Sequence, residues 1–249
     1  MRSHSTVDSG FYAACAGLRA RSQALEIVAN NLANLNTTGY RSHETTFRSL
    51  LATVAGANPL NRAVNDFGVL GGTRVDLHPG NLESTGGRLD FGLEGEGFFA
   101  IQSRGQTLYT RNGNFRLSPA GQLITADGDV VLGEQGPIAV PSGQLAVGTD
   151  GTLSVDGAIT GKLRLAAFAP GSQLRAVGES YYVSDSGAVP KPAAGTSVRQ
   201  GMLESSNVNA VSAVIGLISV QREAEMLQRA LSVFHGEFNH IAATDLPRI

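Results

Sequence analysis

The residues of this chain that could do chemistry are a few carboxylates, five histidines and a single cysteine. Asp127-Gly128-Asp129 resembles the start of a calcium loop, because Ca²⁺ prefers carboxylate oxygens at closely spaced positions. An EF-hand loop needs a glutamate at its twelfth position, where this chain has Ile138. A β-turn is therefore the better interpretation of this segment.

The other candidates have equally plain structural interpretations. Glu94 and Glu96 could form a carboxylate pair for acid–base catalysis, but they flank a glycine at a strand end, where hairpin geometry explains them. Cys15 lies between two alanines and is typical of a small helix-packing residue. The histidines, none of which has metal-ligand spacing, are His4, His43, His78, His235 and His240. The sequence also has no phosphate-binding glycine loop and no nucleophile elbow, so it predicts a protein that is not an enzyme and needs no metal or cofactor.

Two long apolar patterns indicate the elements that organise the chain. Strict spacing of three and four residues over several heptads is typical of coiled coils rather than of ordinary globular helices. The N-terminal pattern runs through Val7, Phe11, Ala14, Leu18, Leu25, Val28, Leu32 and Leu35. The C-terminal pattern runs through Ala210, Ala213, Leu217, Val220, Ala224, Leu227, Leu231, Phe234, Phe238 and Ile241. The sequence predicts helices over about 7–35 and 205–243, the second capped by Ser205-Ser206-Asn207.

Polar residues interrupt the N-terminal helix at four places. Arg21 occupies a position of the apolar pattern, either at its edge with the charge in solvent or in an ion pair between subunits. Asn30, Asn31 and Asn34 are unfavourable inside a helix. They indicate either register-setting hydrogen bonds across a helix interface or fraying of the helix end. We predict an assembly interface made of these asparagines with Phe11, Leu18, Leu25, Val28, Leu32, Leu35, Leu217, Val220, Leu227, Leu231, Phe234, Phe238 and Ile241.

The middle of the chain predicts β structure. Leu89, Phe91 and Leu93 alternate with polar or small residues, and Asn-Gly or Asp-Gly turn signals recur, as at Asn112-Gly113 and Asp127-Gly128. The predicted fold class is α+β, mainly β, with an antiparallel sandwich or barrel-like domain inserted between the terminal helices. The predicted parts are an N-terminal helical segment 1–44, an extended connector 45–87, a β domain 88–202, and a C-terminal helical segment 203–249 that packs with 1–44.

Composition excludes several classes of protein. With a formal net charge of −2 over 249 residues, the chain has no basic surface for nucleic acid. One cysteine cannot form an intramolecular disulfide. No stretch reaches the roughly 18 apolar residues of a membrane span, and the first eight residues lack the apolar run of a cleavable secretory signal.

Three separate motifs resemble one family, the bacterial flagellar axial proteins of rod and hook. The first is Ile27–Arg41, with the sequence IVANNLANLNTTGYR. The second is Glu94–Ile101 followed by Tyr109–Phe115, and the third is Leu203–Asn209 followed by Gln221-Arg222 and Glu225-Met226. This resemblance implies a structural subunit that assembles helically with copies of itself and other rod proteins to transmit torque. It also implies export through the flagellar type III apparatus to the periplasmic rod, without a membrane span or a small-molecule substrate.

Within this family, Gly133–Ile138 and the short segment between Arg41 and Arg88 favour a proximal rod type. A distal rod or hook-type subunit is the alternative within the family. A secreted β-rich enzyme or adhesin with helical docking ends is the alternative from another class.

Overall fold

The computed structural model describes residues 4–48, 69–169, 172, 174–178, 180–184, 190–193 and 195–245. The chain forms two compact units. The helical unit comprises residues 1–32, 44–73 and 210–249, and the β unit comprises 33–43 and 74–209. The β unit therefore contains more of the chain than the segment 88–202, because it includes the stretches that follow the first helix and precede the last one.

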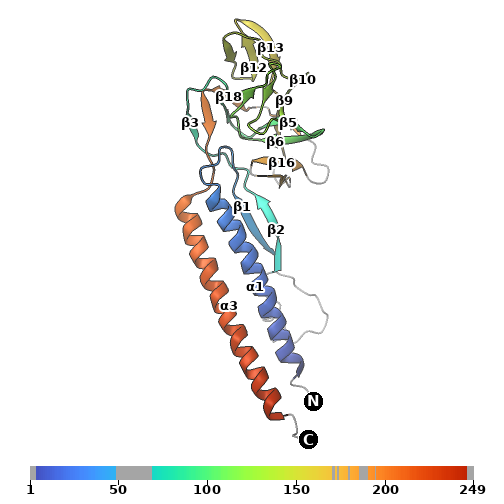
Figure 1. Cartoon of the computed structure of the whole chain (residues 1–249), viewed down its shortest axis with the longest axis vertical. Helices are drawn as coiled ribbons and strands as arrows, with labels where there is room; N and C mark the ends of the chain where they lie inside the picture. The colour runs from blue at the N-terminus through green and yellow to red at the C-terminus, as the bar shows by residue number, and fades with distance from the viewer. Residues whose placement is uncertain are drawn as a thin grey trace. The chain divides into compact units, whose positions relative to one another are not determined.

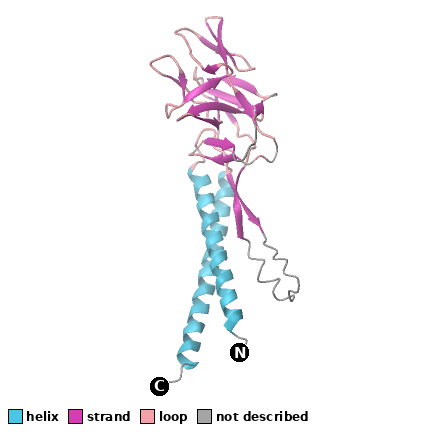
Figure 2. Cartoon of the chain, turned by 90° about the vertical axis from the view of Figure 1, so that its right-hand side faces the viewer, coloured by secondary structure: helices cyan, strands magenta, loops and turns pink. Residues whose placement is uncertain are grey.

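The helical unit consists mainly of two long helices, α1 (His4–Ala33) and α3 (Ala210–Asp245). They lie side by side in both views and run antiparallel (Figures 1 and 2). The Nε of Arg21 on α1 lies 3.0 Å from Oε2 of Glu223 on α3. The same unit contains most of a two-stranded sheet of β1 (His43–Arg48) and β2 (Val69–Val75).

Burial identifies the facing sides of the two helices. On α3 the half-buried residues include Ala213, Leu217, Val220, Ala224, Leu227 and Leu231, which follow the heptad spacing of the sequence. On α1 the buried residues include Ala20 and Ala24, while Leu18, Leu25 and Val28 are half-buried. The face of α1 is thus centred on alanines, about one position away from the predicted leucine pattern, because small side chains let two helices approach closely.

The β unit is built from short antiparallel strands (Figure 1). The strands of its main sheet are β5 (Phe98–Ser103), β6 (Gln106–Thr110), β7 (Arg116–Leu117), β8 (Leu123–Ile124), β9 (Val130–Gly133), β10 (Gly136–Pro137), β14 (Leu165–Ala167), β15 (Leu174–Ala176), β16 (Tyr181–Ser184) and β17 (Lys191–Pro192). Along this sheet the order is β15-β16-β6-β5-β9-β8-β7, with β10, β14 and β17 attached at its sides. Since β15 and β7 end this order, the described strands do not close into a barrel.

Three smaller sheets complete the β unit. One contains β11 (Leu145–Val147), β12 (Thr152–Val155) and β13 (Ala158–Lys162). The others pair β18 (Ser197–Gln200) with β4 (Phe91–Glu94), and β19 (Met202–Glu204) with β3 (Leu82–Ser84). The hydrophobic core is formed by side chains of the main sheet and of these smaller sheets. Its most buried members include Phe91, Phe99, Ile101, Leu123, Val131 and Leu153. The last two strands of the chain, β18 and β19, therefore pair with β4 and β3, which lie far before them in the sequence.

The predicted start of the last helix at Ser205 is wrong, because the chain there is already bonded to other parts of the β unit. Met202–Glu204 is strand β19, and the backbone N–H of Ser205 donates to the carbonyl of Asn81 over 2.8 Å. Helix α3 begins only at Ala210. Residues that suit a helix cap also suit a loop, because their side chains bond equally well to any nearby backbone.

The predicted hairpin turn at Asn112-Gly113 is also wrong. The strands before and after it do not pair with each other; instead the N–H of Phe91 donates to the carbonyl of Gly113 over 3.0 Å. The β5–β6 hairpin turns at Arg104-Gly105, with positive φ at both residues. Two central residues with positive φ form the type I′ geometry that matches the twist of paired strands.

Candidate functional site

Three stretches of the β unit that are distant in sequence are bonded together near the strands β3 and β19. The first follows α1: the N–H of Gly39 donates to the carbonyl of Glu204 over 2.8 Å. The second precedes β3: the N–H of Asp76 donates to the carbonyl of Ser42 over 2.8 Å. The third precedes α3 and holds the bond from Ser205 to Asn81 described above. We call the residues 39–42, 76–81 and 204–207 the junction.

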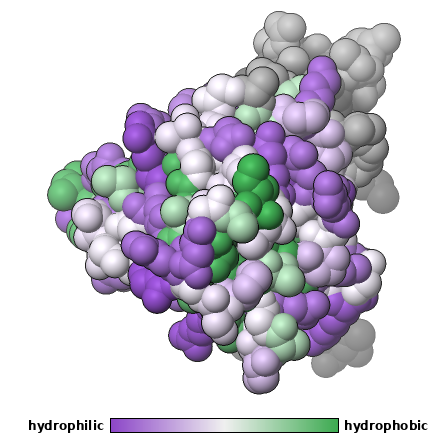
Figure 3. Space-filling model, turned by 90° about the horizontal axis from the view of Figure 1, so that it is seen from above, coloured by the Kyte–Doolittle hydropathy of each residue, from purple (hydrophilic) through white to green (hydrophobic). Residues whose placement is uncertain are grey.

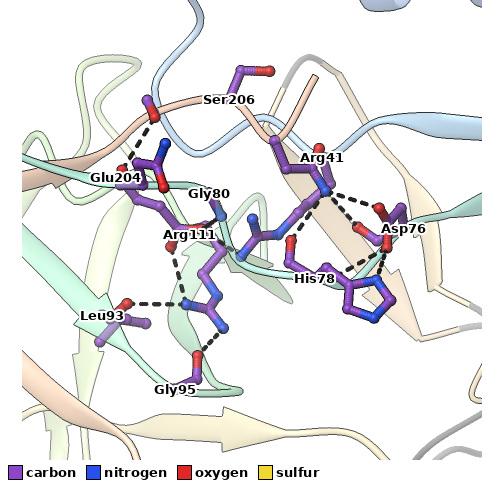
Figure 4. Close-up of polar contacts among 12 residues, drawn as sticks. Arg41, Asp76, His78, Gly80, Leu93, Gly95, Arg111, Glu204 and Ser206 are labelled. Atoms are coloured by element: carbon purple, nitrogen blue, oxygen red, sulfur yellow. Dashed lines mark hydrogen bonds and ion pairs between the residues drawn. The ribbon is translucent and has the colours of Figure 1, made fainter. Parts of the chain in front are cut away.

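Arg41 and Glu204 of the junction form a buried ion cluster with Arg111, and each of the three has 0% of its side chain exposed (Figure 4). Nη2 of Arg41 lies 2.5 Å from Oε1 of Glu204. Nη1 of Arg111 lies 3.0 Å from Oε2 of the same carboxylate. One carboxylate is therefore shared by two guanidinium groups, one from each side.

Backbone groups also bond to Glu204 and Arg111. Oε1 of Glu204 also accepts a hydrogen bond from the N–H of Gly80 over 2.8 Å. Arg111 donates to the carbonyls of Leu93 and Gly95, over 3.3 and 2.5 Å (Figure 4). Since Leu93 and Gly95 lie at the end of β4, the cluster also fixes the β4 end of the β unit.

Two aromatic residues, Phe98 and Tyr182, contact the arginines of the cluster. The guanidinium carbon of Arg111 lies 5.2 Å from the centre of the Phe98 ring. At this distance the face of the ring attracts the positive charge of the guanidinium group. The backbone N–H of Arg41 donates to the hydroxyl of Tyr182 over 3.0 Å. Burial raises the pKa of Tyr182 well above its usual range, so this hydroxyl stays protonated.

The electrostatics of the cluster indicate a structural role. Burial lowers the pKa of Arg111 to about 10, while the charge of Glu204 raises it and that of Arg41 lowers it further. Arg111 remains charged at neutral pH, and no solvent reaches the three side chains. Such a cluster holds three segments in one arrangement, because removing Glu204 would leave two buried guanidinium groups without an anion. It cannot take part in proton transfer with a substrate.

The side-chain amide of Asn207 joins residues 39–42 of the junction to residues 76–81. Its Oδ1 accepts from the N–H of Ser42 over 2.6 Å, and its Nδ2 donates to the carbonyl of His78 over 3.0 Å. The same Nδ2 lies 3.3 Å from Oδ2 of Asp76. This asparagine, expected from the sequence to cap the last helix, is instead a connector within the β unit.

The predicted interface residues divide by their place in the structure. Leu18, Leu25, Val28, Leu32, Leu35, Leu217, Val220, Leu227 and Leu231 are half-buried. Asn31 and Asn34 are buried, whereas Asn30 is exposed. The side chains of Phe11, Phe234, Phe238 and Ile241 lie outside the described residues.

Two of the polar residues that interrupt the N-terminal helical pattern, Arg21 and Asn34, form contacts within this chain. Arg21, for which an ion pair between subunits was one alternative, pairs within the chain with Glu223, and both side chains are partly exposed. Asn34 follows the end of α1, and its Oδ1 accepts from the hydroxyl of Thr37 over 3.0 Å. Asn34 therefore stabilises the turn after the helix.

Three of the residues that the sequence offered for chemistry, Asp127, Glu94 and His43, are engaged in structural contacts. Oδ2 of Asp127 accepts from the hydroxyl of Tyr181 over 2.6 Å, in the turn between β8 and β9. Oε2 of Glu94 accepts two hydrogen bonds from Arg199 on the paired strand β18. His43 stacks on Tyr40 with ring centres 5.8 Å apart. Among the described residues, no cluster of three or more His, Cys, Asp or Glu is placed to hold a metal ion.

The sequence did not predict the ion cluster, although a signal for it existed. Each of its three members lies within one of the three motifs: Arg41 ends the first, Arg111 lies in the second and Glu204 in the third. A charged residue in each of three separate motifs could have suggested a shared contact. Periodicity and turn signals are local, so they contain no information on which charges meet.

Comparison with known proteins identifies the same three segments. The family model "Flagella basal body rod protein" matches residues 11–41, and "Flagellar hook protein FlgE/F/G D1 domain" matches 92–155. "Flagellar basal body rod FlgEFG protein C-terminal" matches 199–235. Each matched segment thus supplies one member of the buried ion cluster.

Individual relatives extend the similarity over most of the chain. The basal-body rod protein FlgF of Caulobacter vibrioides is 32% identical over 90% of this chain and 93% of its own length. The chain belongs to the flagellar basal-body rod protein family. FlgG of Agrobacterium fabrum is 33% identical over 88% of this chain and 92% of its own, and FlgF of Mesorhizobium japonicum is 32% identical over 88% and 90%. Membership of this rod family agrees with a junction that has a structural rather than a catalytic arrangement. Within the described residues, no helix is long and apolar enough to cross a membrane.

Proposed function

We propose that this chain is a non-catalytic structural subunit of the flagellar basal-body rod, which assembles helically with other rod proteins and copies of itself to transmit torque. The observation that carries the proposal is the buried cluster of Arg41, Arg111 and Glu204. It fixes the segments that adjoin both terminal helices to one β unit. A subunit under torque needs a β unit whose distant segments stay bonded to one another, because a deformable unit would absorb the rotation.

The finer architecture of the proposal concerns the helices. We infer that α1 and α3 pack as a coiled coil, with the half-buried heptad residues of α3 against the alanine-centred face of α1. Close-packed helices are stiff, since protein interiors have low compressibility. The proposed organisation keeps two terminal assembly segments, 1–44 and 203–249, a connector at 45–87 and a sandwich-like β domain around 88–202.

Position in the rod and the route to it are further parts of the proposal. Gly133–Ile138 favours a proximal rod, FlgF-like subunit, and the relatives named FlgF and FlgG are similar to this chain at nearly equal identity. A distal rod, FlgG-like or hook-type subunit is therefore the alternative. We further propose export through the flagellar type III apparatus without a cleavable signal, so that the chain would reach the periplasmic part of the basal body.

Deleting the gene and fractionating the basal bodies tests the function. The deletion strain should be non-motile, and antibodies should detect this chain in basal bodies purified from the parent strain. A motile deletion strain, or a chain found only free in the culture medium, would contradict the rod assignment. The second outcome would instead favour a secreted adhesin or enzyme.

Leu227→Asp tests the packing of the two helices. Leu227 is half-buried on the facing side of α3, so a carboxylate there should lower the free energy of unfolding of the helical unit by about 1–3 kcal/mol. Thermal unfolding followed by circular dichroism at 222 nm measures this change. Gln228→Asp is the control, because Gln228 is exposed on the same turn of the helix. Equal melting of the two variants would contradict the assigned face.

A further inference from the structure

Helix α3 has a second apolar stripe, which is exposed to solvent. The exposed large apolar residues of α3 include Val211, Ile215, Ile218, Met226 and Val233, each between 46% and 69% exposed. Their spacing of four, three, eight and seven residues places them on one side of the helix. Arg222 and Arg229, both exposed, occupy the positions between them on the same side. We call these seven residues the outer stripe.

The outer stripe lies on the side of α3 that points away from α1. At about 100° per residue, its residues lie roughly 180° around the helix from Leu217, Val220 and Leu227. Those three are half-buried and face α1. The packing of α1 against α3 therefore leaves the outer stripe uncovered by α1.

A row of exposed apolar residues on one helix differs from what the β unit shows. Among the described residues there, the large exposed apolar side chains are Leu117 on β7, Ile159 on β13 and Val177 directly after β15. The hydropathy view from above shows hydrophobic residues in small patches divided by hydrophilic ones (Figure 3). Single exposed apolar residues are normal on soluble proteins, whereas a continuous row marks a contact surface.

Helix α1 has a complementary outward side. Its exposed residues include Cys15, Arg19, Ser22, Glu26, Ala29, Asn30 and Ala33, which again lie on one side of a helix. This side, which we call the α1 outer face, has small or polar residues with one cation, Arg19, and one carboxylate, Glu26. It can receive bulky side chains from a partner, because its own side chains are mostly short. Glu26 can also pair with an arginine of the outer stripe.

We propose that the outer stripe of one copy packs against the α1 outer face of the next copy. This inference rests on the proposed rod function and specifies which helix faces form the contact. The two faces point in opposite directions from the helix pair, so a copy bound at one leaves the other open. Such head-to-tail contacts generate rings or open helical assemblies rather than closed dimers.

The size of the contact indicates when it forms. From Val211 to Val233 the stripe is roughly 33 Å long, and a helix is about 10 Å wide, so it covers on the order of 300–400 Å² per partner. A stable pairwise interface covers about 800 Å² per partner. The contact is therefore too small to hold two free copies together, and it becomes stable only where each subunit has several neighbours.

The first test compares Ile218→Asp with Gln228→Asp. Gln228 is an exposed residue of α3 that lies roughly 120° around the helix from the centre of the stripe. Ile218→Asp should leave the helical melting of the purified chain unchanged, because the residue is solvent-exposed there. It should reduce the amount of this chain in purified basal bodies at least tenfold and abolish motility. Gln228→Asp should resemble the parent in all three measurements. An Ile218→Asp chain that is incorporated like the parent overturns the inference.

The second test identifies the occupant by cross-linking. A chain with Met226→Cys has a thiol on the outer stripe in addition to native Cys15 on the α1 outer face. A bis-maleimide with a spacer of roughly 10 Å cannot join these two thiols within one copy, since they lie on opposite sides of a helix pair at least one helix diameter thick. Basal bodies treated with it should yield covalent dimers and longer ladders of this chain. The parent, with Cys15 alone, should yield no ladder.

The outcomes separate this inference from the rod function. Cross-linking of the Met226→Cys chain only to a different protein, or only to itself within one copy, overturns the pairing of copies. This chain would still be a rod subunit if it is present in basal bodies and its deletion abolishes motility. Absence of this chain from basal bodies would refute the rod function itself.

Discussion

Glu204→Gln is expected to lower the free energy of unfolding of the β unit by about 3–5 kcal/mol, because it leaves Arg41 and Arg111 as two buried cations without an anion. The side chain keeps its size, so the loss comes from charge and not from packing. Denaturant unfolding of the full chain, followed by tyrosine fluorescence from the β unit, measures the change.

Glu94→Gln is the matched control. It removes the same charge from a Glu–Arg pair of similar geometry, yet the Glu94 side chain is 57% exposed and its partner Arg199 is 49% exposed. Exposed pairs contribute at most about 1 kcal/mol, so this variant should unfold close to the parent. Comparable losses in the two variants would show that burial does not decide the effect.

A triple variant distinguishes charge from position. Arg41→Met, Arg111→Met and Glu204→Leu together remove all three charges and keep most of the volume. Such replacements are often neutral or stabilising, so the triple variant should be more stable than Glu204→Gln alone. A triple variant that is less stable than Glu204→Gln would mean that the backbone hydrogen bonds of these side chains matter more than their charges.

Gly39→Ala is expected to lower the free energy of unfolding of the β unit by about 3 kcal/mol or more. Gly39 has φ of +69°, a conformation that costs a residue with a Cβ roughly 1–2 kcal/mol. In addition, a Cβ there would collide with the backbone nitrogen of Asn112 and lie 2.5 Å from the carbonyl carbon of Arg111. Backbone atoms cannot move aside as a flexible side chain can, so the junction must open. Denaturant unfolding of the full chain measures this loss.

Gly86→Ala separates the two causes. Gly86 has φ of +68°, nearly the same as Gly39, but a Cβ there meets no atom within 4 Å. It should therefore show only the conformational cost of roughly 1–2 kcal/mol. If both variants lose the same stability, close packing of Gly39 against the strand end at Arg111 is not important for the β unit.

Local patterns in the sequence determined the elements whose formation depends on neighbouring residues. The heptad spacing predicted both long helices, and α1 and α3 extend over most of the predicted ranges. Asp127-Gly128 predicted the turn between β8 and β9 because the glycine supplies the positive φ that the turn requires. Such signals are readable since the physical cause lies within a few residues.

Tertiary structure decided the features that depend on a distant partner. Asn112-Gly113 has the pattern of a hairpin turn, but the bond from Phe91 fixes it in another arrangement. Ser205–Asn207 has the pattern of a helix cap, yet strand pairing and the contacts of Asn207 keep this stretch in the β unit. In both cases the local preference was satisfied equally well by a different structure, and long-range hydrogen bonds selected that structure.

The two apolar stripes of α3 illustrate the same division. The sequence by itself determined that α3 is a helix with a heptad pattern, because apolar residues at spacings of three and four share a face. Only the tertiary structure decided that the face with Leu217 and Leu227 packs within the chain and that Ile215 and Ile218 stay exposed. Likewise, only folding brought Arg41, Arg111 and Glu204 together. The physical reason is that periodicity specifies which residues lie on one side of an element, whereas the partner of that side depends on how the whole chain packs.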